Sequence, residues 1–442
     1  MIRSIGEIRR DPLSFLNRMY SQFGDVVQFP IPDPPTYLVS HPETARRVLV
    51  GNARAYGKRT IQYTTLSLVT GEGLLTADTD EWRGQRRRLQ PAFHHSTLEQ
   101  IADHVRTSSD RLLTRWSTND DAVFDIDEAM MHLALEVVGK SLFGADLSGD
   151  AARLAQATVE ALDIVVKKAR SPLSPPLRVP TPANVALRSA VANLDSSVDA
   201  MLAERASRPR GPGEPPRDML DLLLAADDEG RTMSLDEVRN QIITFIVAGH
   251  ETVASALTWA WQLLEMHPDA LSRVRAEATP FVGSGGPQFA DLARLPYTAA
   301  VIDEVLRLYP PAWLITRRSH QDDVLDGVEM KRGSLIIVSP WLVQRHPSLW
   351  ERPNQFIPER FLDHAGQRRR DVINGPGYIP FGAGPRLCIG RDMALVEAIL
   401  VLACIAPKVE LTAVGPTPVA MPLVTIRPRG GLPMRLKVKR VP

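Results

Sequence analysis

The sequence contains only two cysteines among its 442 residues, Cys388 and Cys404. Two thiols cannot form a disulfide framework, so this count favours a reducing compartment. Aromatic residues make up only 6% of the chain, and 52 Lys and Arg offset 51 Asp and Glu to leave a net charge of +1. That balance argues against a protein that coats nucleic acid or binds an acidic membrane by charge alone.

Long apolar runs are also missing. No segment reaches the ~20 apolar residues of a membrane-spanning helix, and the longest, near Ile242, is interrupted by His250 and Glu251. Residues 1–16 carry charges every few positions and lack the apolar core of a signal peptide. We therefore expect a cytoplasmic protein with no membrane span. A hydrophobic content of 44% is enough for a large core.

The periodicity of the chain is mostly helical. Strand signals at 23–29 and 36–40 make about the first 60 residues β-rich, whereas helical patterns dominate the remainder. Two breaks rich in proline, at 171–182 and 207–218, interrupt the helices. A helical pattern resumes after each break, so we expect one domain over residues 1–442.

One helix, predicted over 234–267, is unusually long. Ser234 is a suitable N-cap, and Glu237 stands three residues later, which is the spacing of a capping box. The His267-Pro268 pair ends the pattern. At 1.5 Å per residue this helix spans roughly 48 Å. We therefore expect it to cross the molecule.

Cys388 stands between a glycine-rich loop and a predicted helix. Gly382 and Gly384 permit positive φ, and a helix N-terminus with Arg386 nearby favours a thiolate. The further Cys and His ligands that zinc requires are absent at the usual spacings. A single axial thiolate suits haem instead, because the porphyrin supplies four nitrogens. Cys404 lies in an apolar run and is expected to be a buried structural residue.

This loop resembles the haem-thiolate signature of the cytochromes P450. Residues 381–390 read F-G-A-G-P-R-L-C-I-G and match every fixed position of F-x-x-G-x-R-x-C-x-G, and Ala394 and Glu397 fit its usual continuation. The resemblance implies a mainly helical, triangular-prism fold with small β-sheets, in which haem b lies between the long distal helix and the Cys-loop helix. It implies Cys388 as the axial iron ligand, with haem contacts from Phe381, Arg386, Ile389 and Gly390.

The middle of the long helix, A-G-H-E-T at 248–252, resembles the oxygen-binding segment of the same family. Ala248 and Gly249 are small enough for the helix to pass over a haem face. The Thr252 hydroxyl can hydrogen-bond dioxygen, and Glu251 can relay protons from solvent. The alternative for Thr252 is a hydrogen bond to the carbonyl four residues earlier in the helix. Val253 replaces a hydroxyl residue common in the family, and we expect it to affect pocket shape.

Several cations fit the two haem propionates. Trp82 and Arg86 are one helical turn apart and resemble the family's W-x-x-x-R, whose indole N–H and guanidinium can both bind a carboxylate. Arg317 resembles a further propionate ligand, with Arg318 as a close rival. His346 is a third possibility, for which a loop-capping role is the alternative. The other arginines of the W-x-x-x-R segment are expected on a solvated or partner-binding face: Arg83, Arg87 and Arg88.

Glu304 and Arg307 lie three residues apart on one predicted helix. With Arg360 in the P-E-R-F segment they resemble the family's buried Glu-Arg-Arg network. The resemblance implies a structural role in holding the Cys loop. The alternative is a surface ion pair of little energetic importance.

The resemblance implies a monooxygenase that inserts one atom of O2 into a hydrophobic small molecule, by hydroxylation or epoxidation of a terpene, fatty acid, steroid or polyketide. Core packing is the alternative for the aromatic residues expected in the pocket. Two other functions remain open: an H2O2-using peroxygenase, and a haem sensor or carrier without turnover. The intact Glu251–Thr252 pair argues against both. The expected pocket comprises a variable loop at 61–75 together with Phe245, Ala248, Trp313, Leu314, Leu423 and Val424.

The source of electrons has to be a separate protein. The G-A-G-P-R-L segment ends in Leu387 where a dinucleotide fingerprint needs glycine, and no phosphate-binding loop is present. Position 254 is alanine, so His250 and Glu251 do not begin a zinc-protease motif. We expect a ferredoxin or flavodoxin with an NAD(P)H-dependent reductase. A basic docking face is predicted, with a solvated face as the alternative, at Arg386, Arg391 and Arg368–Arg370.

Overall fold

The computed structural model describes residues 6–8, 10–31, 33–119, 121–147, 151–169, 175–211, 214–227 and 230–439. Part of the predicted break at 171–182 and the start of the chain lie outside these ranges. The α-helices are α2 (Pro12–Phe23), α3 (Pro42–Arg46), α4 (Ile61–Thr70), α5 (Thr79–Leu89), α6 (His95–Ser117), α7 (Ile126–Phe143), α8 (Ala151–Ala169), α9 (Pro182–Ser207), α10 (Met219–Leu224), α11 (Leu235–Met266), α12 (Pro268–Ala278), α13 (Pro296–Leu308), α14 (Pro340–Val343), α15 (Arg370–Ile373) and α16 (Arg391–Ile405).

The strands form small sheets, as predicted. They are β1 (Val26–Phe29), β2 (Thr36–Val39), β3 (Tyr56–Gly57), β4 (Val123–Asp125), β5 (Ile315–Ser319), β6 (Asp323–Leu325), β7 (Val328–Met330), β8 (Leu335–Val338), β9 (Val409–Ala413), β10 (Ala420–Pro422), β11 (Ile426–Pro428) and β12 (Pro433–Val438). The largest sheet has the order β1-β2-β8-β5-β3, in which only β2 and β8 run parallel. A second sheet has the order β4-β12-β9, and two pairs, β6–β7 and β10–β11, complete the set.

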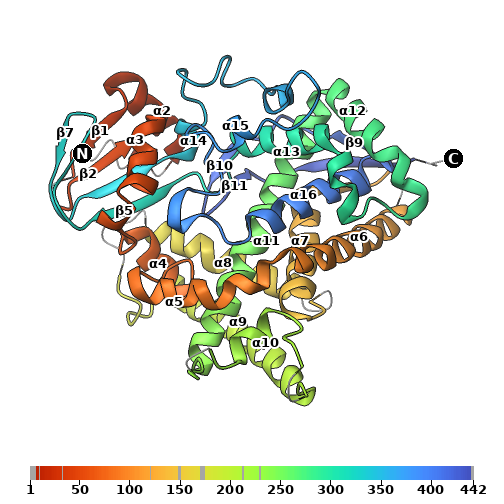
Figure 1. Ribbon diagram of the computed structural model, residues 1–442, viewed down its shortest axis with the longest axis horizontal. Coiled ribbons are helices and arrows are strands. Elements are labelled where there is room, and N and C mark those ends of the chain that lie inside the picture. The colour runs from red at the N-terminus through yellow and green to blue at the C-terminus, as the bar shows by residue number, and fades with distance from the viewer. Residues whose placement is uncertain are drawn as a thin grey trace.

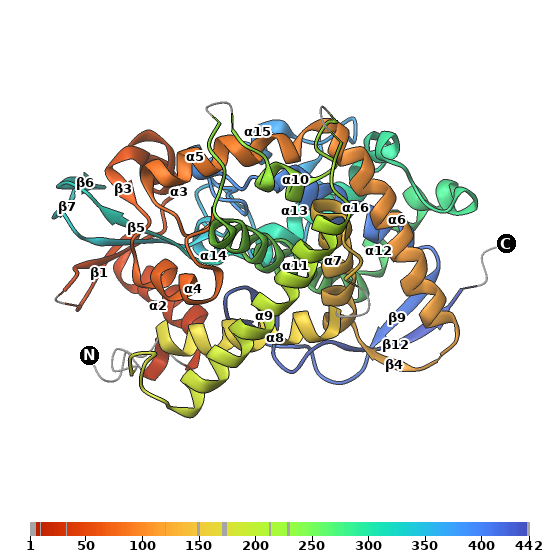
Figure 2. The ribbon, with the colours of Figure 1, turned by 90° about the horizontal axis from the view of Figure 1, so that it is seen from below.

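The five-stranded sheet lies on the left of Figure 1, and most of the helices lie to its right, together with β9 of the second sheet. The first 60 residues hold both strands and helices, in the order α2, β1, β2, α3 and β3. Figure 2 shows α9 and α8 side by side across the lower face, and these two helices are in contact. Helix α11 passes through the centre in both views.

Helix α11 forms as the sequence predicts. Ser234 caps it, and the reciprocal bonds of the capping box with Glu237 are both present. The helix ends at Met266, before His267 and Pro268. Among the described residues it alone has the length and apolar character of a membrane span, and 83% of its most apolar window is buried inside the molecule. Its apolar character is therefore that of a central core helix.

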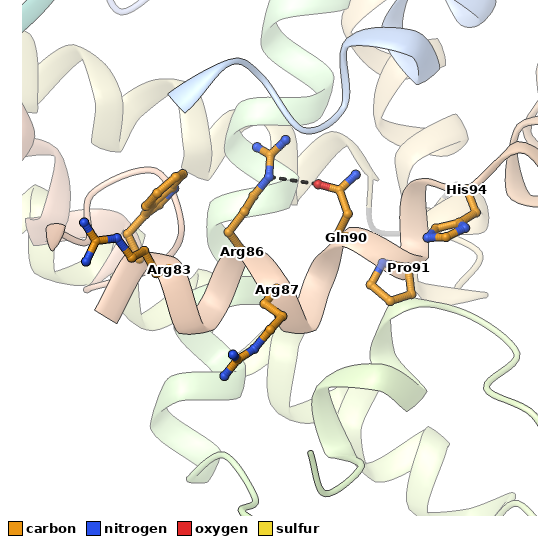
Figure 3. Close-up of a pocket in the computed structure, with 7 residues that line it drawn as sticks. Arg83, Arg86, Arg87, Gln90, Pro91 and His94 are labelled. Atoms are coloured by element: carbon orange, nitrogen blue, oxygen red, sulfur yellow. Dashed lines mark hydrogen bonds between the residues drawn. The ribbon is translucent and has the colours of Figure 1, made fainter. Parts of the chain in front are cut away.

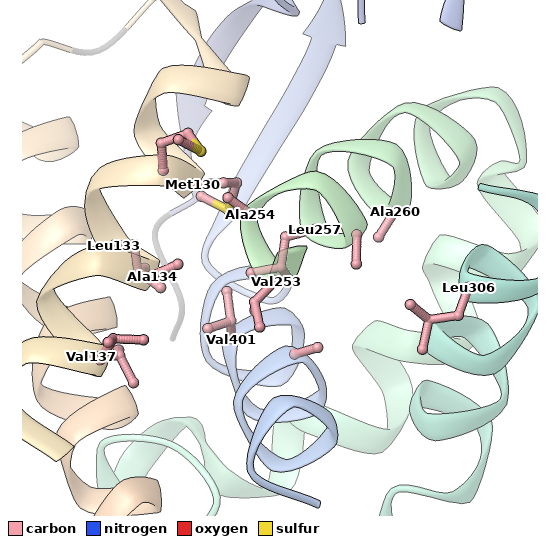
Figure 4. Packing of buried hydrophobic residues seen from close by; sticks show 14 of the residues in the cluster. Met130, Leu133, Ala134, Val137, Val253, Ala254, Leu257, Ala260, Leu306 and Val401 are labelled. Atoms are coloured by element: carbon pink, nitrogen blue, oxygen red, sulfur yellow. The ribbon is translucent and has the colours of Figure 1, made fainter. Parts of the chain in front are cut away.

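Figure 4 shows the core around α11. Met130, Leu133 and Val137 of α7 face the side chains of Val253 and Leu257 on α11. One cluster of buried apolar residues extends along the chain from Leu13 to Leu436, and a second, between Tyr37 and Ile379, packs on the five-stranded sheet. Because one core joins both ends of the chain, we propose the single domain that the sequence predicts.

Gly249 lies where α11 packs closely against α7. A Cβ atom at this position would lie 2.9 Å from Cγ2 of Val138, which is itself fully buried. The absent side chain therefore lets the two helices pack closely, a reason for glycine that the sequence alone did not indicate.

Gly249→Ala is expected to lower the free energy of unfolding by up to about 2 kcal/mol. Overpacking a core costs about 1–3 kcal/mol, from which the gain of about 1 kcal/mol in helix propensity is subtracted. The double variant with Val138→Ala should lose less than the sum of the two single variants. Gly84→Ala in α5 is the matched control, because nothing lies within 4 Å of its new Cβ. Denaturant titration that showed Gly249→Ala as stable as Gly84→Ala would contradict this packing argument.

Candidate active site

The loop before Cys388 takes the backbone conformation that its glycines allow. Gly382 and Gly384 have φ values of 73° and 71°. A Cβ on Gly384 would lie 2.1 Å from the carbonyl oxygen of Leu49, so this loop packs directly on neighbouring backbone. The Cys388 N–H donates to the carbonyl of Phe381 at 3.0 Å, which closes the loop. Helix α16 follows with Gly390 as its N-cap.

The pKa of the Cys388 thiol is raised from its ordinary value, contrary to expectation. Burial is the largest cause, and it outweighs the backbone N–H of Gly390 and the charges of Arg86 and Arg391, which lower the pKa. The side chain nevertheless presents accessible surface. A bound metal ion deprotonates a coordinating thiol outright, so the raised pKa of the free Cys388 thiol is compatible with a thiolate ligand to iron.

Helix α5 brings the predicted W-x-x-x-R residues against the Cys loop. Figure 3 shows Arg86 pointing to one side of α5 and Arg87 to the other. The Arg86 guanidinium donates to the Leu387 carbonyl at 2.8 Å and to Gln90 at 3.0 Å. The guanidinium carbon of Arg386 lies 4.4 Å from the ring centroid of Trp82. Residues some 300 positions apart in the sequence therefore meet beside Cys388.

A cluster of buried cations, Lys58, Arg317 and Arg386, lies next to this loop. Burial and the charges of Arg317 and Arg386 hold the pKa of Lys58 well below its usual value, and burial lowers that of Arg386 to about 10. Asp78 accepts from Arg386 at 3.2 Å and from the Lys58 backbone at 3.1 Å. Arg318 is exposed, so the structure favours Arg317 over its rival.

These residues fit haem. Of the three cationic side chains, only that of Arg386 bonds a carboxylate among the described residues, namely Asp78, and unpaired positive charge inside a protein is costly. Haem b brings two propionates, which bind Arg and Lys through charge-assisted hydrogen bonds. Lys58 now donates to the Leu75 carbonyl at 2.6 Å, and Arg317 to the Thr316 carbonyl at 2.9 Å. Such neutral partners leave the charge of both residues available for an anion.

For His346 the sequence left two roles open, a propionate contact and loop capping. Its contacts in the structure are of the second kind. Its Nε2 lies 2.9 Å from an oxygen of Asp25, and its Nδ1 lies 2.6 Å from the Ser348 hydroxyl. These contacts tie the 346–348 loop to the amino-terminal segment, as a loop-capping residue does.

The A-G-H-E-T motif at 248–252 provides an accessible patch on α11, which is otherwise buried in this part. From Gln241 to Leu264, every residue is buried except Ala248, Gly249 and Thr252. These three residues lie on neighbouring turns of one side of the helix. The Thr252 hydroxyl donates to the Ala248 carbonyl at 2.8 Å, which is the hydrogen bond within the helix considered above as the alternative. The hydroxyl oxygen still has lone pairs with which to accept a proton donor.

Glu251 is buried, and burial raises its pKa to about 7. The positive charge of Arg427 and the hydroxyl of Thr425 oppose this rise, while the charge of Asp127 adds to it. One carboxylate oxygen, Oε2, has no hydrogen-bond partner among the described residues. Near neutral pH this carboxyl can therefore both hold and release a proton.

The predicted pocket residues are partly core residues. Phe245 is buried and packs against Phe93 at a centroid distance of 5.8 Å. Trp313 is buried, and its indole N–H donates to the Leu423 carbonyl at 3.0 Å. The predicted variable loop at 61–75 is a helix, α4, over residues 61–70. The remaining predicted residues are only partly buried and keep accessible surface: Ala248, Leu314, Leu423 and Val424.

The comparisons with known proteins agree on one family. The family model described as cytochrome P450 matches residues 2–423. The chain belongs to the cytochrome P450 family. It is similar to cyclooctatin synthase of Streptomyces melanosporofaciens, with 36% identity over 95% of this chain and 88% of that protein. Pentalenene oxygenase of Streptomyces avermitilis is 33% identical over 92% and 88%.

Among solved structures, CYP175A1 from Thermus thermophilus superposes with a TM-score of 0.79. Its sequence is 30% identical, and the match covers 98% of this chain and 97% of that one. The predicted P450 fold is therefore confirmed. The protein is a cytochrome P450 monooxygenase, and its cofactor is haem b.

The Glu-Arg-Arg residues form a buried network in this P450. Arg307 donates to both oxygens of Glu304, at 2.6 and 2.8 Å, and both residues are fully buried. Arg360 lies 3.4 Å from Glu304, and the backbone N–H of Ile357 donates to the same carboxylate at 2.8 Å. Arg307 also donates to the carbonyls of the segment at 344–355, which leads toward the Cys loop.

Sequence reasoning missed four residues near this site. Lys58 follows a short strand without any local motif, and only folding brings it to Arg317. The others surround Glu251 from distant parts of the chain, and a single sequence carries no signal for this proximity. They are Asp127, Thr425 and Arg427.

Glu304→Gln is expected to destabilise the protein by about 3–5 kcal/mol, because two buried arginines lose their charged partner. Glu204→Gln on α9 is the matched control. Its partner Arg208 lies 3.4 Å away with both side chains mostly exposed, and such pairs contribute about 0–1 kcal/mol. Denaturant titration of both variants measures the difference in their free energies of unfolding. Equal stability of the two variants would show that the buried network is not structural.

Proposed function

We propose that this P450 hydroxylates or epoxidises a cyclic terpene, with Cys388 as the axial haem ligand. The observation that carries the proposal is the coincidence of the accessible patch on α11, at Ala248, Gly249 and Thr252, with the oxygen-binding motif. The substrate class is supported by relatives named for cyclooctatin and for pentalenene, a terpene hydrocarbon. The mostly apolar residues near the patch suit such a substrate.

When bound, haem supplies the iron at which dioxygen is reduced and one oxygen atom is transferred to the substrate. The chain would hold its propionates with the cations around Cys388 and with the indole of Trp82. Thr252 would orient a proton donor through its free hydroxyl lone pairs. Glu251, whose pKa of about 7 places it between its two forms at neutral pH, would accept protons at its carboxylate from the solvent side and pass them on toward Thr252. These roles were given to Thr252 and Glu251 from the sequence, and they remain our proposal.

The two other functions that the sequence left open make different predictions. A peroxygenase would give product with H2O2 alone and would not depend on Thr252. A sensor or carrier would bind haem and a ligand without forming product. The buried acid beside a helix hydroxyl favours activation of dioxygen over both.

The test begins with the reduced, carbon-monoxide-bound absorption spectrum of the purified protein and of Cys388→Ala. Thiolate ligation predicts a strongly red-shifted Soret band that the variant loses, because the thiolate donates electron density to the iron. A panel of cyclic terpenes, fatty acids and steroids is then incubated with a ferredoxin, its reductase and NADPH. We expect an oxygenated terpene, and a reduction of at least about 10-fold in Thr252→Ala. Product from H2O2 alone, or from a fatty acid only, would contradict the proposal.

We also propose that the electron donor is an acidic ferredoxin or flavodoxin and that the protein works in the cytoplasm. The predicted docking arginines are largely neutralised: Arg391 bonds Asp392, Arg368 bonds Asp303 and Arg369 bonds Asp371. Arg386 is held by Asp78 inside the molecule, so only Arg370 of that set stays exposed without an ion pair to another described residue.

A more suitable surface lies on α5 (Figure 3). An open hollow of about 470 Å³ is lined there by Trp82, Arg83, Arg86, Arg87, Gln90, Pro91 and His94. Arg87 is exposed in this hollow, and Arg86 connects it to the carbonyl next to Cys388. A carboxylate-rich partner seated here would lie close to the iron ligand.

Arg87→Glu is expected to slow reduction by the ferredoxin by about 10-fold at low salt, because a rim charge acts mainly on association. The difference from wild type should shrink as ionic strength rises. Arg208→Glu on α9, also an exposed arginine, is the control and should change nothing. Stopped-flow reduction under carbon monoxide measures the rate. An unchanged rate in Arg87→Glu would place the docking surface elsewhere.

A further inference from the structure

The β10–β11 hairpin is docked on the side of α11 that carries Glu251. The carbonyl of Ile426, in β11, accepts from the Ser255 hydroxyl at 2.6 Å and from the Trp259 indole at 2.9 Å. Ser255 and Trp259 lie four and eight residues after Glu251, on the same helix face. Residues next to Ile426 in β11 are therefore held beside the turn of α11 that bears the acid.

Arg427, the next residue of β11, is held by Asp127 at the start of α7. Its guanidinium donates to Asp127 Oδ2 at 2.5 Å, and both side chains are largely buried. The other oxygen of Asp127 accepts from the Thr258 hydroxyl of α11 at 3.2 Å. The ion pair is thus anchored on α7, on α11 and on the hairpin at once.

Three groups on other elements act electrostatically on Glu251. They are Arg427 of β11, Asp127 of α7 and the hydroxyl of Thr425 between β10 and β11. Further charge comes from Asp125, which acts on Arg427. On α11 itself, His250 bonds the Ile246 carbonyl through Nδ1, and burial lowers its pKa to about 4, so it is neutral at pH 7. The field at Glu251 is therefore dominated by one cation and its counterion.

We propose that Arg427, oriented by Asp127, is a positioning residue that sets the pH range in which Glu251 takes up and releases its proton. This inference rests on the proposed role of Glu251 in proton transfer. Arg427 touches neither substrate nor haem in this proposal, and it acts only through the acid.

The two members of the ion pair have opposite effects on Glu251. Arg427 stabilises the carboxylate form, so its removal raises the pKa of Glu251. Asp127 destabilises that form, so neutralising Asp127 lowers the same pKa. A residue that only supported the fold would not give shifts of opposite sign.

The experiment is an infrared pH titration of the purified holoenzyme. The carbonyl band of protonated Glu251 is assigned by its loss in Glu251→Gln, and its midpoint is followed in each variant. We expect the midpoint to rise by about one pH unit in Arg427→Gln and to fall in Asp127→Asn. Arg427→Lys keeps the charge and should stay within a few tenths of a unit of wild type.

Arg205→Gln is the matched control for loss of a buried ion pair. Arg205 binds Asp218 and Asp221 between α9 and α10, with burial close to that of the Arg427–Asp127 pair. This variant should lose stability without any shift of the Glu251 band. A midpoint that stays at the wild-type pH in Arg427→Gln, or moves in the same direction in both pair variants, overturns the proposal. If Arg427→Gln does not fold, Asp127→Asn decides, because a midpoint that does not fall in this variant also overturns the proposal.

Turnover separates this inference from the proposed function. With a terpene substrate, the pH at which product per NADPH falls to half should move with the infrared midpoint in each variant. Infrared shifts of opposite sign in a protein that oxidises no substrate would support the electrostatic role of Arg427 and reject the proposed function. Turnover whose pH profile ignores the infrared shifts would reject the role of Arg427 in proton transfer.

Discussion

Burial of α11 is the constraint on which the rest of this structure depends. A helix of 32 residues that is enclosed by α7, α13 and α16 contributes apolar contacts to one continuous core. The same enclosure makes any polar side chain on it costly. Between Gln241 and Leu264 that burial is broken at Ala248, Gly249 and Thr252, and the buried Glu251 is the neighbour of Thr252.

Enclosure also explains the distribution of charge. Buried ions are tolerated when they are paired, and several buried carboxylates have an arginine partner: Glu304 with Arg307, Asp303 with Arg368, and Asp127 with Arg427. The cations around Cys388 depart from this rule, since Lys58 and Arg317 bond carbonyl groups. The dianionic cofactor of the family accounts for the difference, because its propionates would complete the pairing.

Local sequence patterns predicted the helices and loops well, but they predicted only part of the contacts between residues far apart in the sequence. The capping box and the His-Pro pair defined α11, and the glycines of the Cys loop predicted its positive φ values. Arg86, Arg386 and Cys388 come together as the family motif implies, although the thiol pKa is raised rather than lowered. Lys58 and Arg427 could not be found, because their significance depends on contacts across hundreds of residues. The docking face at Arg386, Arg391 and Arg368–Arg370 stays a prediction, and most of these arginines have acidic neighbours that the sequence did not indicate.

The β10–β11 hairpin shows how substrate contact and proton supply can share one small element. Leu423 is tied to Trp313 by the indole hydrogen bond, and Val424 follows it at the predicted pocket. Three residues later comes Arg427, whose charge acts on Glu251, and Ile426 between them is hydrogen-bonded to α11. The hairpin is tied to neighbouring elements at Leu423 and at Ile426, so a shift of Leu423 also affects the position of Arg427. The predicted pocket residues Leu423 and Val424 and the charge that acts on Glu251 are therefore carried by one hairpin, whereas Phe245 on α11 belongs to the core and packs against Phe93.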